Sequence, residues 1–364
     1  MGIPSVVRLG RRRPSRAVRA ERAAALLRID EGRAIDALTT YVRAARSETR
    51  AHSALLGLSG GLDSAVLAAV TVCGLGADRV RLLYLYDQTS SGALRTNART
   101  IADWLGIPLE ETSIETDLRK AGVYSSRAAG LTSLSGQLNR LLHRVYRVMT
   151  GEPPFVSSLR AGSFMTSCGQ PRGGVHVALV LEAEAGFVAR HRHRRHLLEA
   201  EAKADDCFLL GAANKTEWLT GWFVKGGIDD LPKQPLKGLC KTQVRQLADA
   251  LGVPASVRLA PPSPDMMRGI TDELALGMSY PTIDVALDVL EGGVTIEQAA
   301  GAGVTAEDLR CVQKLTYLSA WKRASPAAAS ESPSERRSVP RHRPELPVDG
   351  GPSGGLRSMT RDGV

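Results

Sequence analysis

The residues most suited to phosphate chemistry form a glycine- and serine-rich octapeptide, Gly57-Leu58-Ser59-Gly60-Gly61-Leu62-Asp63-Ser64. Two adjacent glycines let the backbone approach a polyanion, because neither carries a Cβ atom. Backbone N–H groups at the start of a following helix, together with the two serine hydroxyls, can donate hydrogen bonds to phosphate oxygens. Asp63 is suited to hold a magnesium ion against the same oxygens. The octapeptide therefore predicts a site for the phosphates of a nucleotide.

The octapeptide lies between an apolar run at 53–56 and a second at 65–70, which predict a buried strand and a buried helix. It lacks the Gly-Lys-Ser/Thr of a P-loop, which disfavours transfer of a γ-phosphoryl group. Ser-Gly-Gly-x-Asp-Ser at a strand-to-helix junction resembles the pyrophosphate-binding loop of the N-type ATP pyrophosphatases. That resemblance implies cleavage of ATP between its α- and β-phosphates and adenylation of an acceptor. The alternative interpretation is an ordinary serine and glycine turn at the start of a helix.

Strand and helix patterns alternate around this loop. Strands are predicted at 79–85 and 109–114, with a helix over 93–105 between them and another helix over 24–47 before the loop. Short alternating units of this kind predict an α/β fold with a doubly wound parallel sheet. The resemblance of the loop implies that this sheet is the middle layer of a three-layer α/β/α fold of the adenine nucleotide α-hydrolase type. Ligands of such sheets bind at the carboxyl ends of the strands, where the octapeptide would lie.

The rest of the chain divides into a folded part and two polar ends. A strand is predicted at 207–210, and helices are predicted near 135–150, 214–224, 241–251, 282–291 and 305–320. Residues 151–186 predict no element and stand as an unplaced insertion within a single domain over 23–323. Residues 1–22 are expected to form a disordered basic arm, and residues 324–364 a disordered tail, since neither has much apolar surface to bury.

Charge and cysteine content narrow the class of protein. The net charge is +9, but residues 1–22 alone carry +6, so the folded part is close to neutral and nucleic-acid binding is not expected. No apolar run reaches the ~18 residues of a membrane span, and no apolar segment follows the basic start, which disfavours a secretory signal. The odd number of scattered cysteines argues for a reducing, cytoplasmic location and against a zinc or iron–sulfur site. They are Cys73, Cys168, Cys207, Cys240 and Cys311.

A second group of polar residues extends from 207 to 273. It comprises Gly211-Ala212-Ala213-Asn214-Lys215-Thr216-Glu217, then Gly221-Trp222-Phe223-Val224-Lys225 with Asp229-Asp230, then Lys241-Thr242, Pro262-Ser263-Pro264-Asp265 and Thr271-Asp272-Glu273. Taken in order with the octapeptide, these motifs resemble the ammonia-dependent NAD synthetase family. The resemblance covers roughly residues 50–118 and 187–323.

The resemblance implies a role for each matched position. The octapeptide from Gly57 to Ser64 would hold the ATP phosphates, with Lys241 and Ser263 as further ATP contacts. Asp63 and Glu217 would share a catalytic Mg²⁺, and together with Lys241 they are the expected catalytic residues. The dinucleotide substrate would be bound by Arg192, Lys225, Asp229 or Asp230, Lys322 and Arg323. From the residues alone, Arg192 also belongs to a charge run at 190–196, and Arg194 and Arg195 leave its register open.

The implied reaction joins deamido-NAD and ammonia at the expense of ATP, yielding NAD, AMP and pyrophosphate, in a homodimer for which helix 135–150 is a candidate interface. Three positions depart from the family pattern. Ala212 and Ser263 each stand where threonine is usual, and Lys225-Gly226-Gly227-Ile228-Asp229 replaces Lys-Tyr-Gly-Asp-Gly. Two alternatives therefore stay open: a ligase that amidates a different carboxylate, and a non-catalytic nucleotide-binding protein.

Overall fold

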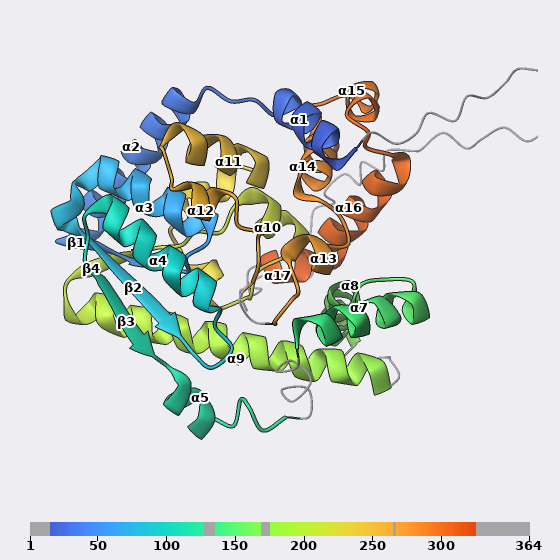
Figure 1. Cartoon of the computed structure of the whole chain (residues 1–364), viewed down its shortest axis with the longest axis horizontal. Helices are drawn as coiled ribbons and strands as arrows, with labels where there is room; N and C mark the ends of the chain where they lie inside the picture. The colour runs from blue at the N-terminus through green and yellow to red at the C-terminus, as the bar shows by residue number, and fades with distance from the viewer. Residues whose placement is uncertain (1–14, 127–134, 169–174, 265–266, 325–364) are drawn as a thin grey trace, which may run out of the picture. The chain divides into compact units, whose positions relative to one another are not determined.

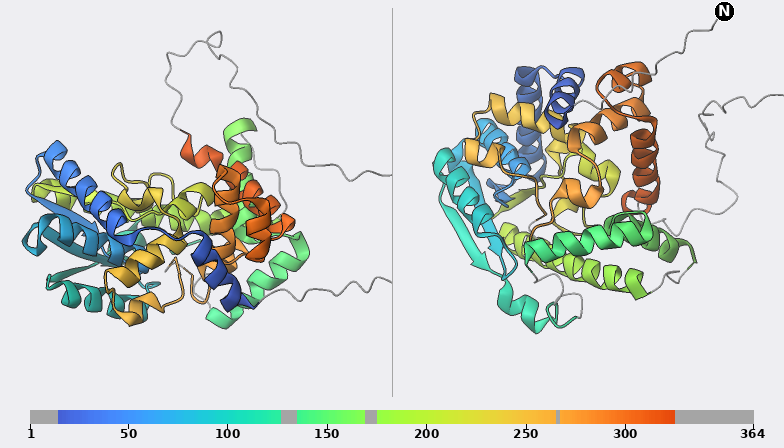
Figure 2. Two further views of the ribbon diagram at one scale, coloured as in Figure 1. Left: turned by 90° about the horizontal axis from the view of Figure 1, so that it is seen from above. Right: turned by 45° about the vertical axis from the view of Figure 1, so that its right-hand side comes forward.

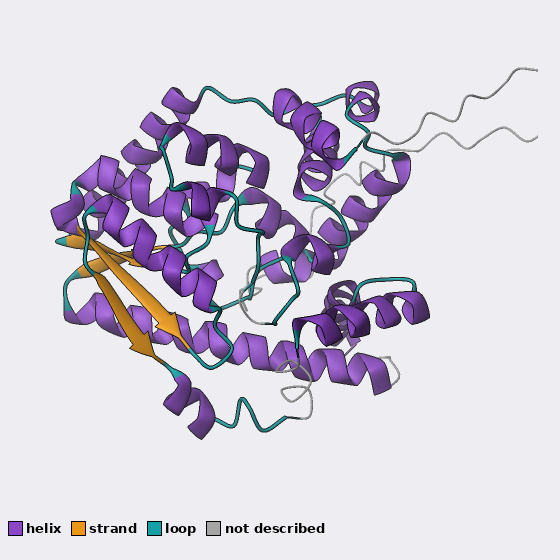
Figure 3. Ribbon diagram, in the orientation of Figure 1, coloured by secondary structure: helices purple, strands orange, loops and turns teal. Residues whose placement is uncertain are grey.

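Four parallel strands form the centre of the fold, in the order β3–β2–β1–β4 (Figures 1 and 3). They are β1 (Ser53–Gly57), β2 (Val80–Tyr86), β3 (Leu109–Ser113) and β4 (Cys207–Leu210). In register, Leu56 of β1 pairs with Leu82 on one side and with Leu210 on the other. The chain winds outward from β1 through β2 to β3, and then returns to place β4 on the opposite side of β1. The doubly wound α/β fold predicted from the sequence is confirmed, with its topological switch point between β1 and β4.

This computed structural model describes residues 15–126, 135–168, 175–264 and 267–324. The expected tail after Ala324 and most of the expected basic arm lie outside the described residues. Within the described part, no helix combines the length and apolarity that a membrane crossing requires.

Helices cover both faces of the sheet, because successive side chains of a strand point to opposite faces. On one face, Leu56 belongs to a core that includes residues of α2 (Glu31–Thr49), α3 (Leu62–Leu75), α4 (Gly92–Leu105) and α11 (Lys241–Ala250). On the other face, Leu55 packs with Leu198 of α9 (Val175–Ala204), the long helix that runs along the sheet in Figure 1. Strands β1, β2 and β4 are largely buried and read as apolar runs, whereas β3 lies at the edge of the sheet and is polar and partly exposed.

A second core contains only helices. It gathers apolar residues of α1 (Arg16–Leu26), α8 (Pro154–Cys168), α14 (Tyr280–Glu291) and α16 (Ala306–Leu318). Figure 2 shows these helices beside the sheet layers. Tyr280 and Leu159 are among the side chains with no exposed surface. This helical core fixes α14, which proves to support the site.

The remaining elements are short, apart from α7 (Gly136–Thr150), and connect these layers. They are α5 (Glu115–Lys120), α10 (Lys215–Thr220), α12 (Ala255–Arg258), α13 (Asp272–Leu276), α15 (Ile296–Gly301), α17 (Ala320–Arg323), and the 3₁₀ turns η1 (Ala77–Arg79), η2 (Ile228–Asp230) and η3 (Pro235–Gly238).

Three segments differ from their sequence predictions. The single helix predicted over 24–47 is two helices, since Asp30 accepts a hydrogen bond from the Arg33 N–H at 2.9 Å and starts α2 afresh. Helix α1 begins at Arg16, inside the segment expected to be a disordered arm, and Arg22 donates to the Gly301 carbonyl at 2.7 Å. The unplaced insertion contains α8 and the start of α9. Proline in this insertion looked like a helix breaker, but Pro154 occupies the first position of α8, where its missing N–H costs nothing.

Candidate active site

The octapeptide turns from the end of β1 into α3 at the switch point of the sheet. Gly60 has φ +77°, and a Cβ at this position would clash with the carbonyl oxygen of Leu94. Only glycine fits there, because the left-handed conformation and the close approach both exclude a side chain. Gly61, by contrast, has ordinary extended backbone with φ −88°. Every residue of the octapeptide except Gly60 lines a cavity of about 740 Å³.

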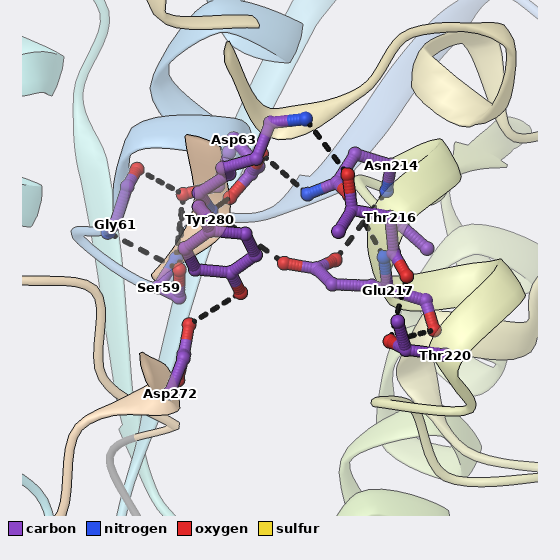
Figure 4. Close-up of polar contacts among 12 residues, drawn as sticks. Ser59, Gly61, Asp63, Asn214, Thr216, Glu217, Thr220, Asp272 and Tyr280 are labelled. Carbon is purple, nitrogen blue, oxygen red and sulfur yellow. Dashed lines mark hydrogen bonds and ion pairs between the residues drawn. The ribbon is translucent and has the colours of Figure 1, made fainter. Parts of the chain in front are cut away.

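The two serines of the octapeptide hold its shape. Their Oγ atoms lie 3.0 Å apart, Ser64 Oγ donates to the Gly61 carbonyl at 3.0 Å, and the Gly61 N–H donates to Ser59 Oγ at 3.2 Å. These bonds restrain the loop from within, and Figure 4 shows the positions of Ser59 and Gly61. The N-terminus of α3 follows immediately, so its positive end of the helix dipole faces the same space.

Asp63 in the first turn of α3 meets residues from two distant helices. Asn214 donates from Nδ2 to Asp63 Oδ1 at 3.0 Å, and Lys241 Nζ contacts Asp63 Oδ2. Asn214 also caps α10: its side chain accepts from the Glu217 N–H at 3.0 Å, and the Glu217 carboxylate accepts from the Asn214 N–H at 3.3 Å. This reciprocal capping box fixes Glu217 beside Asp63 (Figure 4).

Lys241, the first residue of α11, completes the group. Its Nζ lies 3.5 Å from Glu217 Oε1, so one ammonium contacts both carboxylates. Burial raises the pKa of Glu217 well above its ordinary value, the charge of Asp63 adds to this, and Lys241 opposes it. Burial alone would lower the pKa of Lys241, but the charges of Asp63 and Glu217 raise it instead. The Lys241 ammonium is thus held between the carboxylates of Asp63 and Glu217, beside the octapeptide.

Tyr280 and Asp272 form a buried layer behind Lys241. The Tyr280 hydroxyl donates to Asp272 Oδ2 at 2.9 Å, and Lys241 Nζ lies 5.2 Å from the centre of the Tyr280 ring. Burial raises the pKa of Asp272, against the opposing influence of Lys241 and of the Tyr280 hydrogen bond. The ring and the carboxylate restrict the directions in which the lysine side chain can move.

Much of the cavity lining is aromatic and apolar. Six of the sixteen Trp, Tyr and Phe residues of the chain line it, although they are scattered in the sequence. Helices α7, α8 and α9 supply half of the six, and Phe155 packs edge-to-face on Trp222 with ring centres 4.7 Å apart. Aromatic surfaces of this kind suit flat heterocyclic rings. The six are Tyr84, Tyr146, Phe155, Phe187, Trp222 and Phe223.

Besides the octapeptide and Lys241, three more of the residues predicted to bind substrate or ATP line the cavity: Asp229, Lys322 and Ser263. Asp229 Oδ2 lies 3.0 Å from His191 Nδ1; burial would raise the pKa of Asp229, but the charge of His191 lowers it. Lys322 is buried and donates to the carbonyls of Gly221 and Phe223 at 3.0 and 2.8 Å. Burial lowers the pKa of Lys322.

The other four predicted substrate residues are not among those that line the cavity. Arg192 is exposed, whereas Arg194 two positions later lines the cavity and lies 3.3 Å from Asp87 Oδ2. Lys225 donates to the carbonyls of Trp321 and Ala324 at 3.0 and 2.9 Å.

Asp230 and Arg323 contact the chain itself. Asp230 accepts from the Gly226 N–H at 2.9 Å. Arg323 donates to the carbonyls of Leu219 and Thr316 at 2.8 and 2.7 Å, and burial lowers its pKa. In this structure Lys225, Asp230 and Arg323 therefore order the loop at 221–230 and the end of the helical core.

Sequence reasoning missed several residues that the fold brings to the site. Asn214 was quoted only as part of a motif, yet its Asn-x-x-Glu spacing to Glu217 is the signature of a capping box and could have been recognised. Tyr280 carries no comparable local signal, because only tertiary packing places it near Lys241. Arg194 was left open as an alternative to Arg192 in the charge run at 190–196, and the structure places it at the cavity. Asp265 lies outside the described residues.

A doubly wound parallel sheet with this loop at its switch point defines a nucleotide-binding protein of the adenine nucleotide α-hydrolase type. The NAD synthase family profile matches residues 34–132 and 181–326. The chain is 34% identical to the NH₃-dependent NAD⁺ synthetase of Coprothermobacter proteolyticus, covering 71% of this chain and 84% of that one. It is also 34% identical to the synthetase of the same name from Thermotoga maritima, covering 70% and 86%. The chain belongs to the NAD synthase family, a family of carbon–nitrogen ligases.

Solved structures share the fold. The NMN synthetase of Francisella tularensis superposes with a TM-score of 0.59 at 22% identity, covering 83% of this chain and all of that one. The NH₃-dependent NAD synthetase of Campylobacter jejuni gives a TM-score of 0.55 at 18% identity, covering 82% and 99%. Residues 133–180, which include α7 and α8, fall between the two stretches that the family profile matches. The aromatic wall of the cavity therefore comes in part from a segment outside the family pattern.

Proposed function

We propose that this protein converts deamido-NAD to NAD with ATP and ammonia. In the first step a carboxylate oxygen of deamido-NAD bonds to the α-phosphorus of ATP, and pyrophosphate leaves. In the second, ammonia attacks the activated carbonyl carbon, AMP departs with the former carboxylate oxygen, and the nitrogen loses a proton. The observation that carries the proposal is the contact of Lys241 with both Asp63 and Glu217 beside the octapeptide.

The octapeptide would bind the triphosphate through its N–H groups and serine hydroxyls. Lys241 would stabilise the negative charge that develops on the phosphate oxygens as pyrophosphate leaves. A fixed cation lowers the barrier most when it lies where this charge develops. Ser263, in the loop after α12, would contact ATP from the opposite wall of the cavity. Adenylation brings two anions together, so a site without such cations would repel its own substrates.

The residues present fit a magnesium ion. Mg²⁺ prefers carboxylate oxygens, and the Asp63 and Glu217 carboxylates already share one positive group, the Lys241 ammonium. When bound, the ion would neutralise phosphate charge and orient the triphosphate. Asp63 and Glu217 would hold it, with Asn214 keeping Asp63 in position through its 3.0 Å hydrogen bond.

For deamido-NAD, the aromatic wall offers surfaces for the pyridine and adenine rings. Asp229 and Lys322 are the predicted substrate residues that line the cavity, and they keep that role in the proposal. Arg192 on α9, Lys225 and Asp230 in the segment 221–230, and Arg323 on α17 remain in the proposal, although they do not line the cavity. Arg194 is added, because it faces the cavity where Arg192 does not.

The proposal includes a homodimer joined through α7. Along this helix the apolar side chains Leu138, Leu141 and Val148 are 38%, 55% and 85% exposed and do not line the cavity, and they form a stripe that a second copy would cover. Sedimentation of Val148→Glu beside the wild type tests it: a dimer that dissociates supports this interface, and an unchanged dimer places the interface elsewhere.

A cytoplasmic location is also proposed, and free Cys73, Cys207, Cys240 and Cys311 support it.

A different carboxylate acceptor is the second candidate function, favoured by one observation. Helices α7 and α8, which line the acceptor side of the cavity, lie outside the family pattern. A changed wall can select a changed acceptor while the ATP half of the site stays the same.

One assay separates the two functions. AMP and NAD are measured with ATP, Mg²⁺ and ammonium, with and without deamido-NAD, for the wild type and Asp63→Asn. Equal amounts of AMP and NAD that require deamido-NAD, abolished in the variant, support the proposal. AMP formed only with another carboxylate would retain the adenylation chemistry and reject deamido-NAD as the acceptor.

A further inference from the structure

A carboxylate that belongs to neither the loop nor the cavity connects the two helices that carry Glu217 and Lys241. Asp284 lies on α14 and is 1% exposed. Its Oδ1 accepts from the Thr216 hydroxyl at 2.5 Å, and its Oδ2 accepts from the Thr242 N–H at 2.7 Å and from the Thr242 hydroxyl at 2.6 Å. Thr216 in turn accepts the Lys241 N–H at 2.9 Å. All of these atoms are buried.

Both threonines lie next to a residue of the candidate active site in the sequence. Thr216 immediately precedes Glu217 in the first turn of α10, and Thr242 immediately follows Lys241 in the first turn of α11. Asp284 therefore anchors the backbone next to each residue. The distance from Lys241 Nζ to Glu217 Oε1, 3.5 Å, depends on how these two helix starts are held together.

A buried carboxylate is costly unless hydrogen bonds compensate it, so a residue needed only to fill space here would be expected to be apolar. Asp284 instead accepts three hydrogen bonds, each from a group at the start of a helix. Burial raises the pKa of Asp284, and the hydrogen bonds from Thr216 and Thr242 and the charge of Arg245, on α11, oppose this only in part. Tyr280 lies one turn earlier on the same helix and places its ring behind Lys241. Helix α14 thus supports Lys241 through both residues.

We propose that Asp284 is a positioning residue for adenylation, which sets the placement of Lys241 against Glu217 and Asp63 through Thr216 and Thr242. It touches no substrate in this assignment and acts only through the two helix starts. The inference rests on the proposed function in one respect, the roles given to Lys241, Glu217 and Asp63.

The test compares buried threonines in one helix. Thr216→Val removes the hydroxyl that bonds Asp284, and Thr216→Ser keeps it. Thr220→Val is the matched control, because Thr220 is equally buried in α10 and donates instead to the Thr216 carbonyl at 2.7 Å. Asp284→Asn and the double variant with Thr216→Val complete a cycle. For each protein, kcat, KM for ATP, the Kd of Mg·ATP without acceptor, and the thermal midpoint are measured.

We expect kcat to fall on the order of 100-fold in Thr216→Val and in Asp284→Asn, since a displacement of about 1 Å costs this much. The double variant should fall by less than the product of the two single effects, because both changes remove the hydrogen bond between Thr216 and Asp284. Thr216→Ser should restore activity, and Thr220→Val should keep it. The Kd of Mg·ATP should rise in the two impaired variants.

The proposal is overturned if Thr216→Val is folded and keeps the kcat and the Mg·ATP affinity of Thr220→Val. It is equally overturned if Thr216→Ser is as impaired as Thr216→Val, since loss of the hydroxyl would then not be the cause. Should Asp284→Asn fail to fold, the three threonine variants decide the question alone. A wild type that binds Mg·ATP but makes no NAD would reject the proposed function, while the Mg·ATP affinities would still decide the role of Asp284.

Discussion

The Nζ atom of Lys241 lies 3.5 Å from Oε1 of Glu217, with the lysine side chain only 4% exposed. The ammonium also contacts Asp63, so a cation occupies the space between two carboxylates. A triphosphate entering the cavity would find this cation already in place, and the enzyme would not need to reorganise its charges for each turnover.

Lys241→Met should lower kcat by about 100- to 1,000-fold, the usual cost of removing one preorganised group that stabilises developing charge. It also leaves the Asp63 and Glu217 carboxylates without their shared cation. Single-turnover AMP formation measures the effect. Lys233→Met is the control, because Lys233 forms a surface pair with Glu48. A Lys241→Met enzyme as fast as this control would exclude Lys241 from the reaction.

Gly60→Ala should destabilise the protein and prevent ATP binding. Positive φ in a residue with a Cβ costs about 1–3 kcal/mol, and the clash with the Leu94 carbonyl adds to that cost. Urea denaturation measures the free energy of unfolding. Gly92→Ala, where a Cβ would meet no atom within 4 Å, should leave that free energy nearly unchanged. Equal stability of the two variants would contradict the loop geometry.

Phe155→Ala should raise KM for the acceptor and leave KM for ATP unchanged. An aromatic pair such as Phe155 and Trp222 contributes about 0.5–1.5 kcal/mol beyond its buried area, which corresponds to a two- to tenfold effect on KM when its ligand-facing surface is disturbed. Tyr317→Ala, 77% exposed on α16, is the aromatic control. If ATP rather than the acceptor is affected, α8 lies against the nucleotide instead.

His143 on α7 should make stability depend on pH. Burial lowers its pKa, and the charge of Arg147 adds to this. Below about pH 6.5 the unfolded chain therefore binds a proton that the folded protein resists, and the free energy of unfolding falls as the pH falls. The slope is at most about 1.4 kcal/mol per pH unit. His143→Leu should flatten it in urea titrations between about pH 5 and pH 7, whereas replacing the exposed His52 with glutamine should retain it. If the slope is unchanged in His143→Leu, another titratable group causes the pH dependence.

The sequence alone was enough to predict the parallel sheet, to single out the octapeptide and to recognise the family, because each depends on patterns of residues that are close in the sequence. Alternating apolar runs predict strands and helices. A motif of eight consecutive residues can be recognised in the sequence without knowledge of the tertiary structure. The motif at 211–217 was also recognised in the sequence, but the reciprocal hydrogen bonds of Asn214 and Glu217 were not predicted.

Other features came only from the tertiary structure. Lys241 and Asp63 are 178 residues apart, and no local pattern indicates that they touch. The exposure of Arg192 and the cavity-facing position of Arg194 depend on how α9 is rotated against the sheet. Helix α8 was hidden because Pro153-Pro154 looks like a break, while burial of Val156 and Leu159 against other helices stabilises it. Asp284 lies in the helix predicted at 282–291, and only the tertiary structure places its carboxylate among donors from α10 and α11. Contacts between distant segments decide these features, since the free energy that places such side chains comes from packing and burial rather than from neighbours in the sequence.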